Sequence, residues 1–197
     1  MKLATLAIIF ALASVAASAT TLFFDNPTGI LGVSQSYGGF TTAYGFSNVS
    51  TPQKLYGKDL GSGDEQGLGL NGFPDNEISG LGFIQILVSG LHGLSFEMNS
   101  TTDGEQWKVS QSNTLGVVGT LIMTGSDEGV FHAIAPTMSY LTFQNMGTAG
   151  GANVLLEAIN FESAGRNGDV PEPSAGWFAV SGLALILTAK CRQNVKR

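Results

Sequence analysis

The middle of the chain alternates apolar and polar residues in short runs, a pattern typical of β-strands with one buried face. Four runs show it: 94–98, 107–110, 119–124 and 140–144. Leu94, Phe96 and Met98 share one face of the first run, and Trp107 and Val109 share one face of the second. Because no long helical period interrupts these runs, we expect strands that direct their apolar faces into a common core.

Two further runs complete the expected set of strands. Residues 83–88 are almost continuously apolar, which predicts a strand buried on both faces. Residues 153–162 form a last strand with Leu155, Ile159 and Phe161 on one side. Turn signals rich in Gly, Asn and Asp separate the runs at 99–104, 125–129 and 147–151. The spacing predicts an all-β fold, an antiparallel β-sandwich, for which a jelly-roll-like arrangement is one solution.

Composition agrees with a globular, exported body. Only 12% of the 197 residues are charged and 43% are hydrophobic, which excludes a disordered chain. The segment 20–173 holds four basic against fifteen acidic residues, a net formal charge of −11. Such a body is not expected to bind nucleic acid, which requires a basic face. The single cysteine, Cys191, leaves the body without a disulfide, a zinc cluster or a cysteine nucleophile.

The N-terminus has the layout of a secretory signal peptide. Lys2 precedes an apolar run at 3–15, and Ala17-Ser18-Ala19 forms a small-x-small cleavage site. We expect residues 1–19 to be removed and the mature chain to begin near Thr20. The alternative is a retained membrane anchor, for which the apolar run is short.

The C-terminus has three parts. Val170-Pro171-Glu172-Pro173 ends a linker at 164–174, an apolar segment follows at 175–189, and residues 190–197 carry four positive charges. The prolines keep the chain extended, the apolar segment halts translocation, and the basic end stays in the cytoplasm. As a helix the apolar segment would span roughly 22 Å against a hydrocarbon core of roughly 30 Å. This short span favours a transient stop, and a plain C-terminal transmembrane anchor is the alternative.

The order of Pro171, Glu172 and Pro173, a short apolar span and a basic end resembles the PEP-CTERM sorting signal of Gram-negative bacteria. The resemblance implies recognition by an exosortase, transient anchoring in the inner membrane, and delivery to the cell surface or the extracellular space. It also implies an association with exopolysaccharide and biofilm. A sortase signal, the nearest alternative layout, would need a Leu-Pro-x-Thr-Gly motif, which the sequence lacks.

The body, residues 20–163, has a looser resemblance to other PEP-CTERM bodies. It rests on five pieces: Gly67-Leu68-Gly69, Asn76-Glu77-Ile78, the apolar run 83–88, Phe96-Glu97-Met98-Asn99-Ser100 and Gly104-Glu105-Gln106-Trp107. The resemblance implies a β-sandwich and no known catalytic residues.

The densest acidic region offers candidate calcium ligands: Asp59, Asp64, Glu65 and Asp75. Carboxylates and carbonyls in Gly-rich loops are the ligands that Ca²⁺ prefers, and it needs six or more oxygens. The sequence shows neither an EF-hand nor a nonapeptide repeat. Carboxylates solvated in turns are the other interpretation, and no other cofactor is expected.

Exposed aromatic rings can stack on sugars, and Tyr37, Tyr44 and Trp107 are candidates. Tyr37 and Tyr44 lie in the Gly- and aromatic-rich stretch 36–46, for which an exposed platform and a strand pair with its turn are both open. Core packing is the favoured alternative for Trp107. His92 and His132 are the two histidines, and no Gly-x-Ser-x-Gly elbow is present, so we expect no enzyme. The leading hypothesis is a non-enzymatic surface or matrix protein. A carbohydrate-binding module for exopolysaccharide is the alternative, and a secreted hydrolase is a distant third.

Overall fold

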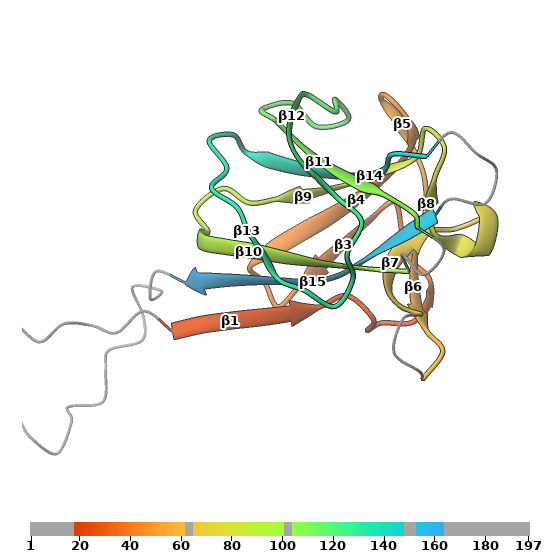
Figure 1. Ribbon diagram of the computed structural model, residues 1–197, viewed down its shortest axis with the longest axis horizontal. Helices are drawn as coiled ribbons and strands as arrows, with labels where there is room; N and C mark the ends of the chain where they lie inside the picture. The colour runs from red at the N-terminus through yellow and green to blue at the C-terminus, as the bar shows by residue number, and fades with distance from the viewer. Residues whose placement is uncertain (1–17, 62–64, 101–103, 148–152, 164–197) are drawn as a thin grey trace, which may run out of the picture. The chain divides into compact units, whose positions relative to one another are not determined.

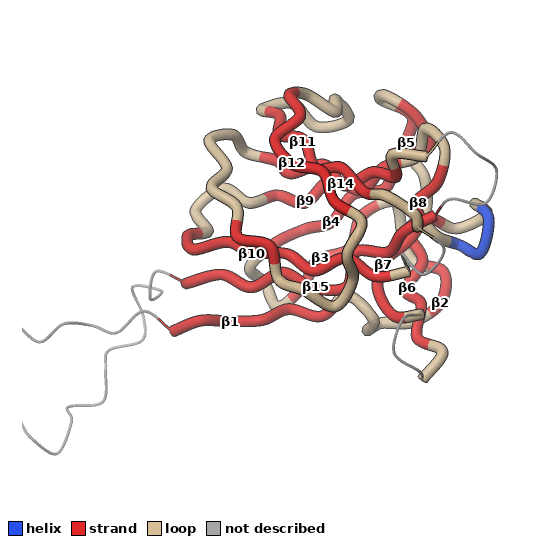
Figure 2. Tube along the Cα trace, viewed as in Figure 1, coloured by secondary structure: helices blue, strands red, loops and turns tan. Residues whose placement is uncertain are grey.

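The computed structural model describes residues 18–61, 65–100, 104–147 and 153–163 of the chain. These residues form strands joined by turns, with one short 3₁₀ helix, η1 (Pro74–Asn76). The strands assemble into two antiparallel sheets (Figures 1 and 2). The predicted all-β, antiparallel β-sandwich is therefore confirmed at the level of its class.

Fifteen strands are assigned within the described residues. They are β1 (Ser18–Phe23), β2 (Gly29–Ile30), β3 (Ser34–Tyr37), β4 (Thr41–Asn48), β5 (Thr51–Pro52), β6 (Leu55–Asp59), β7 (Gln66–Leu70), β8 (Ile78–Ser79), β9 (Phe83–Leu87), β10 (His92–Asn99), β11 (Trp107–Ser112), β12 (Thr120–Gly125), β13 (His132–Ala133), β14 (Tyr140–Asn145) and β15 (Asn153–Ser163).

Each sheet has one continuous strand order. The first sheet runs β13-β10-β15-β7-β6-β2, and β1 and β8 also pair with β15. The second sheet runs β12-β11-β14-β9-β4-β3, and β5 pairs with β4. The last strand, β15, is the centre of the first sheet because four other strands pair with it.

The described chain begins and ends at the same end of the first sheet. β1 pairs antiparallel with β15, from Ser18 opposite Ser163 to Phe23 opposite Ala158 (Figure 1). The beginning of β15 lies at the other end, where Asn153 pairs with Ser79 of β8 next to η1. The first and last strands of the described chain are therefore neighbours in one sheet.

The core fills the space between the sheets, as the alternation predicted. Leu94, Phe96 and Met98 of β10 are buried in it, and so are Trp107 and Val109 of β11. The Phe96 ring meets Trp107 edge to face, with ring centres 5.3 Å apart. Aromatic pairs of this geometry add to the stabilisation that burial supplies.

In β15 one expected face is wrong. Ile159 and Phe161 do face the core, but Val154 and Leu156 join them there, whereas Leu155 is buried outside that cluster. The register moves from Glu97 opposite Ala158 to Met98 opposite Leu156. One extra residue in β15 therefore forms a bulge, and a bulge exchanges the faces on its two sides.

β9 is buried on both faces, as its sequence predicted. Ile84 and Ile86 face the core, and Phe83 and Gln85 on the other face are also fully buried. The cover over Gln85 is a loop: its side chain accepts a hydrogen bond from Gly116 N (2.6 Å) and donates one to Val117 O (2.8 Å). A folded-back loop, not a third layer, gives this strand its second buried face.

The predicted signal segment 1–17 and the predicted transmembrane segment 175–189 lie outside the described residues. Among the residues that are described, no helix has the length and apolar character needed to cross a membrane.

Candidate functional site

The register of the second sheet brings two tyrosines together on its outer face. Tyr44 of β4 lies opposite Gln85 of β9, and Tyr140 of β14 lies opposite Leu87 of the same strand. The two rings are half-buried, 6.3 Å apart between centres, and meet edge to face. Two partly exposed rings on one sheet face form the kind of surface on which a sugar ring can stack.

Hydroxyl groups lie beside these rings. Ser36 Oγ and Thr42 Oγ1 are 3.2 Å apart on β3 and β4, and Thr42 precedes Tyr44 by two residues on the same face of β4. We call Ser36, Thr42, Tyr44 and Tyr140 the tyrosine face. It combines apolar ring surface with polar groups that could exchange hydrogen bonds with sugar hydroxyls.

The other two aromatic candidates lie in the core. Trp107 is 1% exposed and donates from Nε1 to Asp127 O (3.0 Å), and Tyr37 is 5% exposed and packs edge to face on Phe24. Burial, with a smaller effect of Asp25, raises the pKa of Tyr37. Neither ring offers a face to a sugar, so Tyr44 is the accessible member of the predicted set.

Tyr140 was missed as a candidate although its sequence carried a signal. The alternation of 140–144 places Leu141 and Phe143 on the core face of the strand and Tyr140 and Thr142 on its outer face. Alternation within one strand cannot predict which strands pair. The pairing of β14 with β9 and of β9 with β4 is what brings Tyr140 close to Tyr44.

A second group of polar side chains lies at the end of the first sheet near η1. Lys58 of β6 contacts Glu77 Oε1 and Glu65 Oε2 with its ammonium group. Ser100 Oγ donates to the other oxygen of Glu77 at 2.8 Å. The side chains of Lys58 and Glu77 are 9% and 1% exposed, and that of Glu65 is 38% exposed. We call these four residues the Lys58 cluster.

Burial sets the protonation of this cluster. It raises the pKa of Glu77, and the hydrogen bonds from Lys58 and Ser100 oppose this only in part. Burial also lowers the pKa of Lys58, but hydrogen bonds to Glu65 and Glu77 outweigh that effect and leave it above its ordinary value. Two carboxylates thus share one ammonium group in a site that is largely closed to water.

Two of the five sequence pieces singled out in the body, 76–78 and 96–100, meet in this cluster. Glu77 belongs to Asn76-Glu77-Ile78, and Ser100 ends the piece 96–100. Their contact spans 23 positions of the chain. The spacing of the two pieces gave no indication that they would touch.

The predicted calcium ligands are used in other ways where the structure describes them. Asp59 Oδ1 accepts from Gly61 N and Gln66 Nε2, Glu65 contacts Lys58, and Asp75 Oδ2 accepts from Asn153 Nδ2 at 3.4 Å. Asp64 lies outside the described residues. Within residues 18–61, 65–100, 104–147 and 153–163, no three His, Cys, Asp or Glu side chains are arranged to hold a metal ion. The calcium site stays a prediction.

A second group of carboxylates, on β10, β15 and the turn after β1, consists of Glu97, Glu157 and Asp25. Burial raises the pKa of Glu157 to about 7, with further contributions from the charges of Glu97 and Asp25. Burial also raises the pKa of Glu97. In the described part of the chain no lysine or arginine forms an ion pair with any of the three. We call them the carboxylate group.

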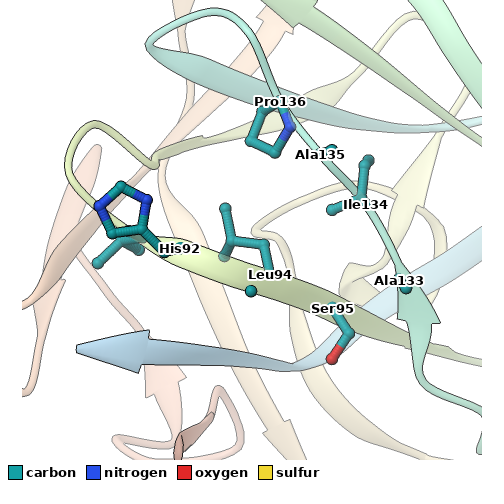
Figure 3. A pocket seen from close by; sticks show the side chains of 9 residues that line it. His92, Leu94, Ser95, Ala133, Ile134, Ala135 and Pro136 are labelled. Atoms are coloured by element: carbon teal, nitrogen blue, oxygen red, sulfur yellow. The ribbon is translucent and has the colours of Figure 1, made fainter. Parts of the chain in front are cut away.

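An open groove runs beside the edge strand β13. It has a volume of about 560 Å³ and is lined by residues 91–95 and 133–136 (Figure 3). Leu94, Ile134 and Pro136 make it mainly apolar, and the exposed His92 lies at one end. No carboxylate is among its lining residues, so the groove does not offer the carboxylate pair that glycoside hydrolysis requires.

The fold and these sites define an antiparallel two-sheet protein with an aromatic sheet face and a buried ionic cluster. No protein-family model, curated protein or solved structure matches the chain.

Proposed function

We propose that this chain is an exported, non-enzymatic protein of the cell surface or extracellular matrix, sorted by an exosortase through its PEP-CTERM-like end. The pairing of β1 with β15 supports the proposal. Because both ends of the sheet unit leave from one side, the two targeting segments are attached at a single end of the body. A jelly-roll-like arrangement of that body remains our expectation for the finer fold.

Removal of both targeting segments would leave most of the pairing between β1 and β15 intact. Cleavage after Ala19 removes two residues of β1, whose partners are Ser163 and Glu162 at the end of the ladder. Thr20 to Phe23 remain opposite Phe161 to Ala158. The tail would therefore serve for transit through the inner membrane, and the body would be the part that acts outside the cell.

The mass of the protein purified from its own host tests this proposal. We expect a chain that begins near Thr20 and ends near Pro171 to Pro173, and a full tail in a strain that lacks the exosortase. A full tail in both strains would mean that residues 175–189 are a permanent membrane anchor, and the sorting proposal would be wrong.

A second candidate function, carbohydrate binding, is favoured by one observation, the contact of two half-buried rings, Tyr44 and Tyr140, on the outer face of the second sheet. The ligand would be the exopolysaccharide of the cell itself, stacked on the two rings and hydrogen-bonded to the hydroxyls beside them. The acidic body would bind neutral or cationic sugars in preference to acidic ones because like charges repel. A secreted hydrolase, the distant alternative, has no comparable observation in its favour.

Binding to purified exopolysaccharide separates this function from a purely structural role. We expect Tyr44→Ala and Tyr140→Ala each to weaken binding about tenfold, which corresponds to about 1.4 kcal/mol. Tyr56→Ala on β6 is the matched control, since it removes a half-buried tyrosine from the other sheet. Equal binding by all three variants and the unmodified protein would exclude the tyrosine face as a glycan site.

A further inference from the structure

Four separate segments of the chain bring an amine, two carboxyl groups and a hydroxyl together in the Lys58 cluster. Lys58 comes from β6, Glu65 directly precedes β7, Glu77 directly precedes β8, and Ser100 directly follows β10. The Lys58 ammonium contacts one oxygen of Glu77, and the Ser100 hydroxyl donates to the other. Glu65 contacts the same ammonium from the side that solvent reaches.

This arrangement has the parts of an amide-forming reaction. Lys58 Nζ is the nucleophile, the Glu77 carboxyl carbon is the electrophile, and donors engage both oxygens of that carboxyl. Glu65 is a carboxylate in contact with the nucleophile, so it can accept and return a proton. We propose that Lys58 and Glu77 condense to an intramolecular amide, an isopeptide bond between β6 and the residue that precedes β8, with the release of one water.

Burial is what makes condensation favourable here and unfavourable in water. In water the ammonium and carboxylate ions are solvated, and their solvation opposes amide formation. In the cluster the two reacting side chains are 9% and 1% exposed, so most of that solvation is already lost. The raised pKa of Glu77, caused first by burial, favours the uncharged acid that an amine can attack. The pKa of Lys58 is also raised by its hydrogen bonds, so the ammonium must first give a proton to Glu77 before the amine can attack.

The proposed step balances without any other reactant. One proton passes from the Lys58 ammonium to Glu77, which gives a neutral amine beside a carboxylic acid. The amine lone pair attacks the carboxyl carbon, and Glu65 takes the second proton from nitrogen. The carbon–oxygen bond then breaks, Glu65 protonates the departing hydroxyl, and water leaves. The Ser100 hydroxyl stabilises the negative oxygen of the intermediate. Glu65 ends in its starting state.

The surrounding backbone holds the reacting groups in place. A side chain on Gly69 would collide with Asn76 O, so β7 and the segment before Glu77 are in close contact. Ser100 has a φ of 61°, and its N–H donates a hydrogen bond to Asn99 Oδ1 at 3.0 Å. Groups fixed in this way react as if at about 10⁵ M or more. Such proximity compensates for the weak electrophilicity of a carboxylic acid.

The amide would supply a covalent cross-link, which this body cannot form from disulfides. The body has no cysteine, so no disulfide can stabilise it outside the cell. An amide between residues 19 positions apart closes a loop that contains β7, and it does not depend on redox conditions. The inference stands apart from the sorting and sugar-binding proposals, because it concerns chemistry inside the folded body.

Peptide mass after trypsin digestion of the denatured full chain tests the proposal. Trypsin cuts after Lys54, Lys58 and Lys108, but not after an acylated lysine. We expect one peptide, 55–108, uncut at Lys58 and lighter by one water. Cutting after Lys58, with fragments of full mass, would show that the cluster is an ion pair only and would overturn the proposal.

Two variants exclude other sources of the missing water. Lys58→Arg keeps the charge next to Glu77 but is not expected to condense, so its peptides should have full mass. A water lost elsewhere, for example by ring closure at Asp103-Gly104, would persist in that variant and count against the proposal. Lys54→Arg, at an exposed lysine, is the matched control and should retain the linked peptide.

The role of Glu65 has its own test. Glu65→Gln removes the proton acceptor but leaves Lys58 and Glu77 in contact. We expect it to slow the appearance of the linked peptide about 100-fold or more, the usual contribution of a general acid–base group. Linkage at the rate of the unmodified protein would rule out Glu65 as the proton-transfer group.

Discussion

Two groups of acidic side chains on the first sheet are buried to a similar degree but have different partners. Glu77, in the Lys58 cluster, is 1% exposed, and Glu97, in the carboxylate group, is 9% exposed. Burial raises the pKa of both. Glu77 has an ammonium and a hydroxyl on its two oxygens, whereas Glu97 has the charge of Glu157 nearby.

The difference shows that burial alone does not decide what a carboxylate contributes. In the Lys58 cluster the charges compensate one another, so removal of one partner leaves the remaining charge buried and uncompensated, which destabilises the fold. In the carboxylate group the charges repel, so protonation relieves the strain and the contribution to stability depends on pH. The same physical cause thus predicts a mutation-sensitive end of the sheet and a pH-sensitive centre.

The largest expected effect follows from removing the ammonium. Lys58→Ala removes both the ammonium partner of Glu77 and the nitrogen of the proposed amide, and leaves the Glu77 carboxyl group buried without a partner. We expect this to lower the free energy of unfolding by about 3–5 kcal/mol. Urea denaturation at neutral pH measures it. Lys54→Ala, at an exposed lysine, should change stability by less than about 0.5 kcal/mol. Equal stability of the two variants would mean that the Lys58 cluster is not a stabilising element.

The fold class was predictable because several strands of the second half of the chain, among them β10, β11 and β14, carry their own alternation of apolar and polar residues. β10 and β11 were correctly oriented from Leu94, Phe96 and Trp107, since a period of two needs no knowledge of the neighbouring strand. The bulge in β15 was not predictable, because an extra residue is defined only against the strand opposite. Leu155 was therefore assigned to the wrong face.

The sites were less predictable than the strands. Lys58 and Glu77 lie 19 positions apart, and their contact depends on the β6–β7 pairing and on the turn at η1. Glu97 and Glu157 are further apart still, and only the β10–β15 register joins them. Acidic residues are frequent in the body, so the sequence offered many pairs and no means to choose among them.

The carboxylate group should make stability fall as pH rises toward neutrality. Glu157 has a pKa of about 7 in the folded protein, above its unfolded value, which is close to 4.3. Below the unfolded value both states carry the proton, and between the two values only the unfolded state releases it. The stabilising contribution of protonated Glu157 is therefore complete at low pH and is lost as pH rises through about 7.

Urea denaturation at pH 5 and pH 8 measures this contribution. Since Glu157 is only half-buried, solvent screening reduces the expected loss to about 1–2 kcal/mol. Glu157→Gln should remove most of that difference and be the more stable protein at pH 8. Glu162→Gln, at an exposed site on the same strand, is the control. An unchanged pH dependence in Glu157→Gln would assign the effect to other groups.

The smallest expected effect concerns calcium at the end of the sheet near η1. Lys58 already contacts Glu65, so a calcium ion there would compete with an ammonium for the same oxygen. We expect at most a weak site, with a dissociation constant near 1 mM, for which 1 mM calcium adds about 0.4 kcal/mol to the stability and raises Tm by roughly 2 °C. Thermal denaturation with calcium, with magnesium and with a chelator measures it, and Asp64→Ala should abolish the calcium-specific part. No calcium-specific shift would remove the loop site. A calcium-specific rise in Tm of about 10 °C would show that calcium, rather than Lys58, is the main counter-charge of these carboxylates. The Lys58 cluster would then differ from the carboxylate group through a bound metal ion and not through its ammonium group.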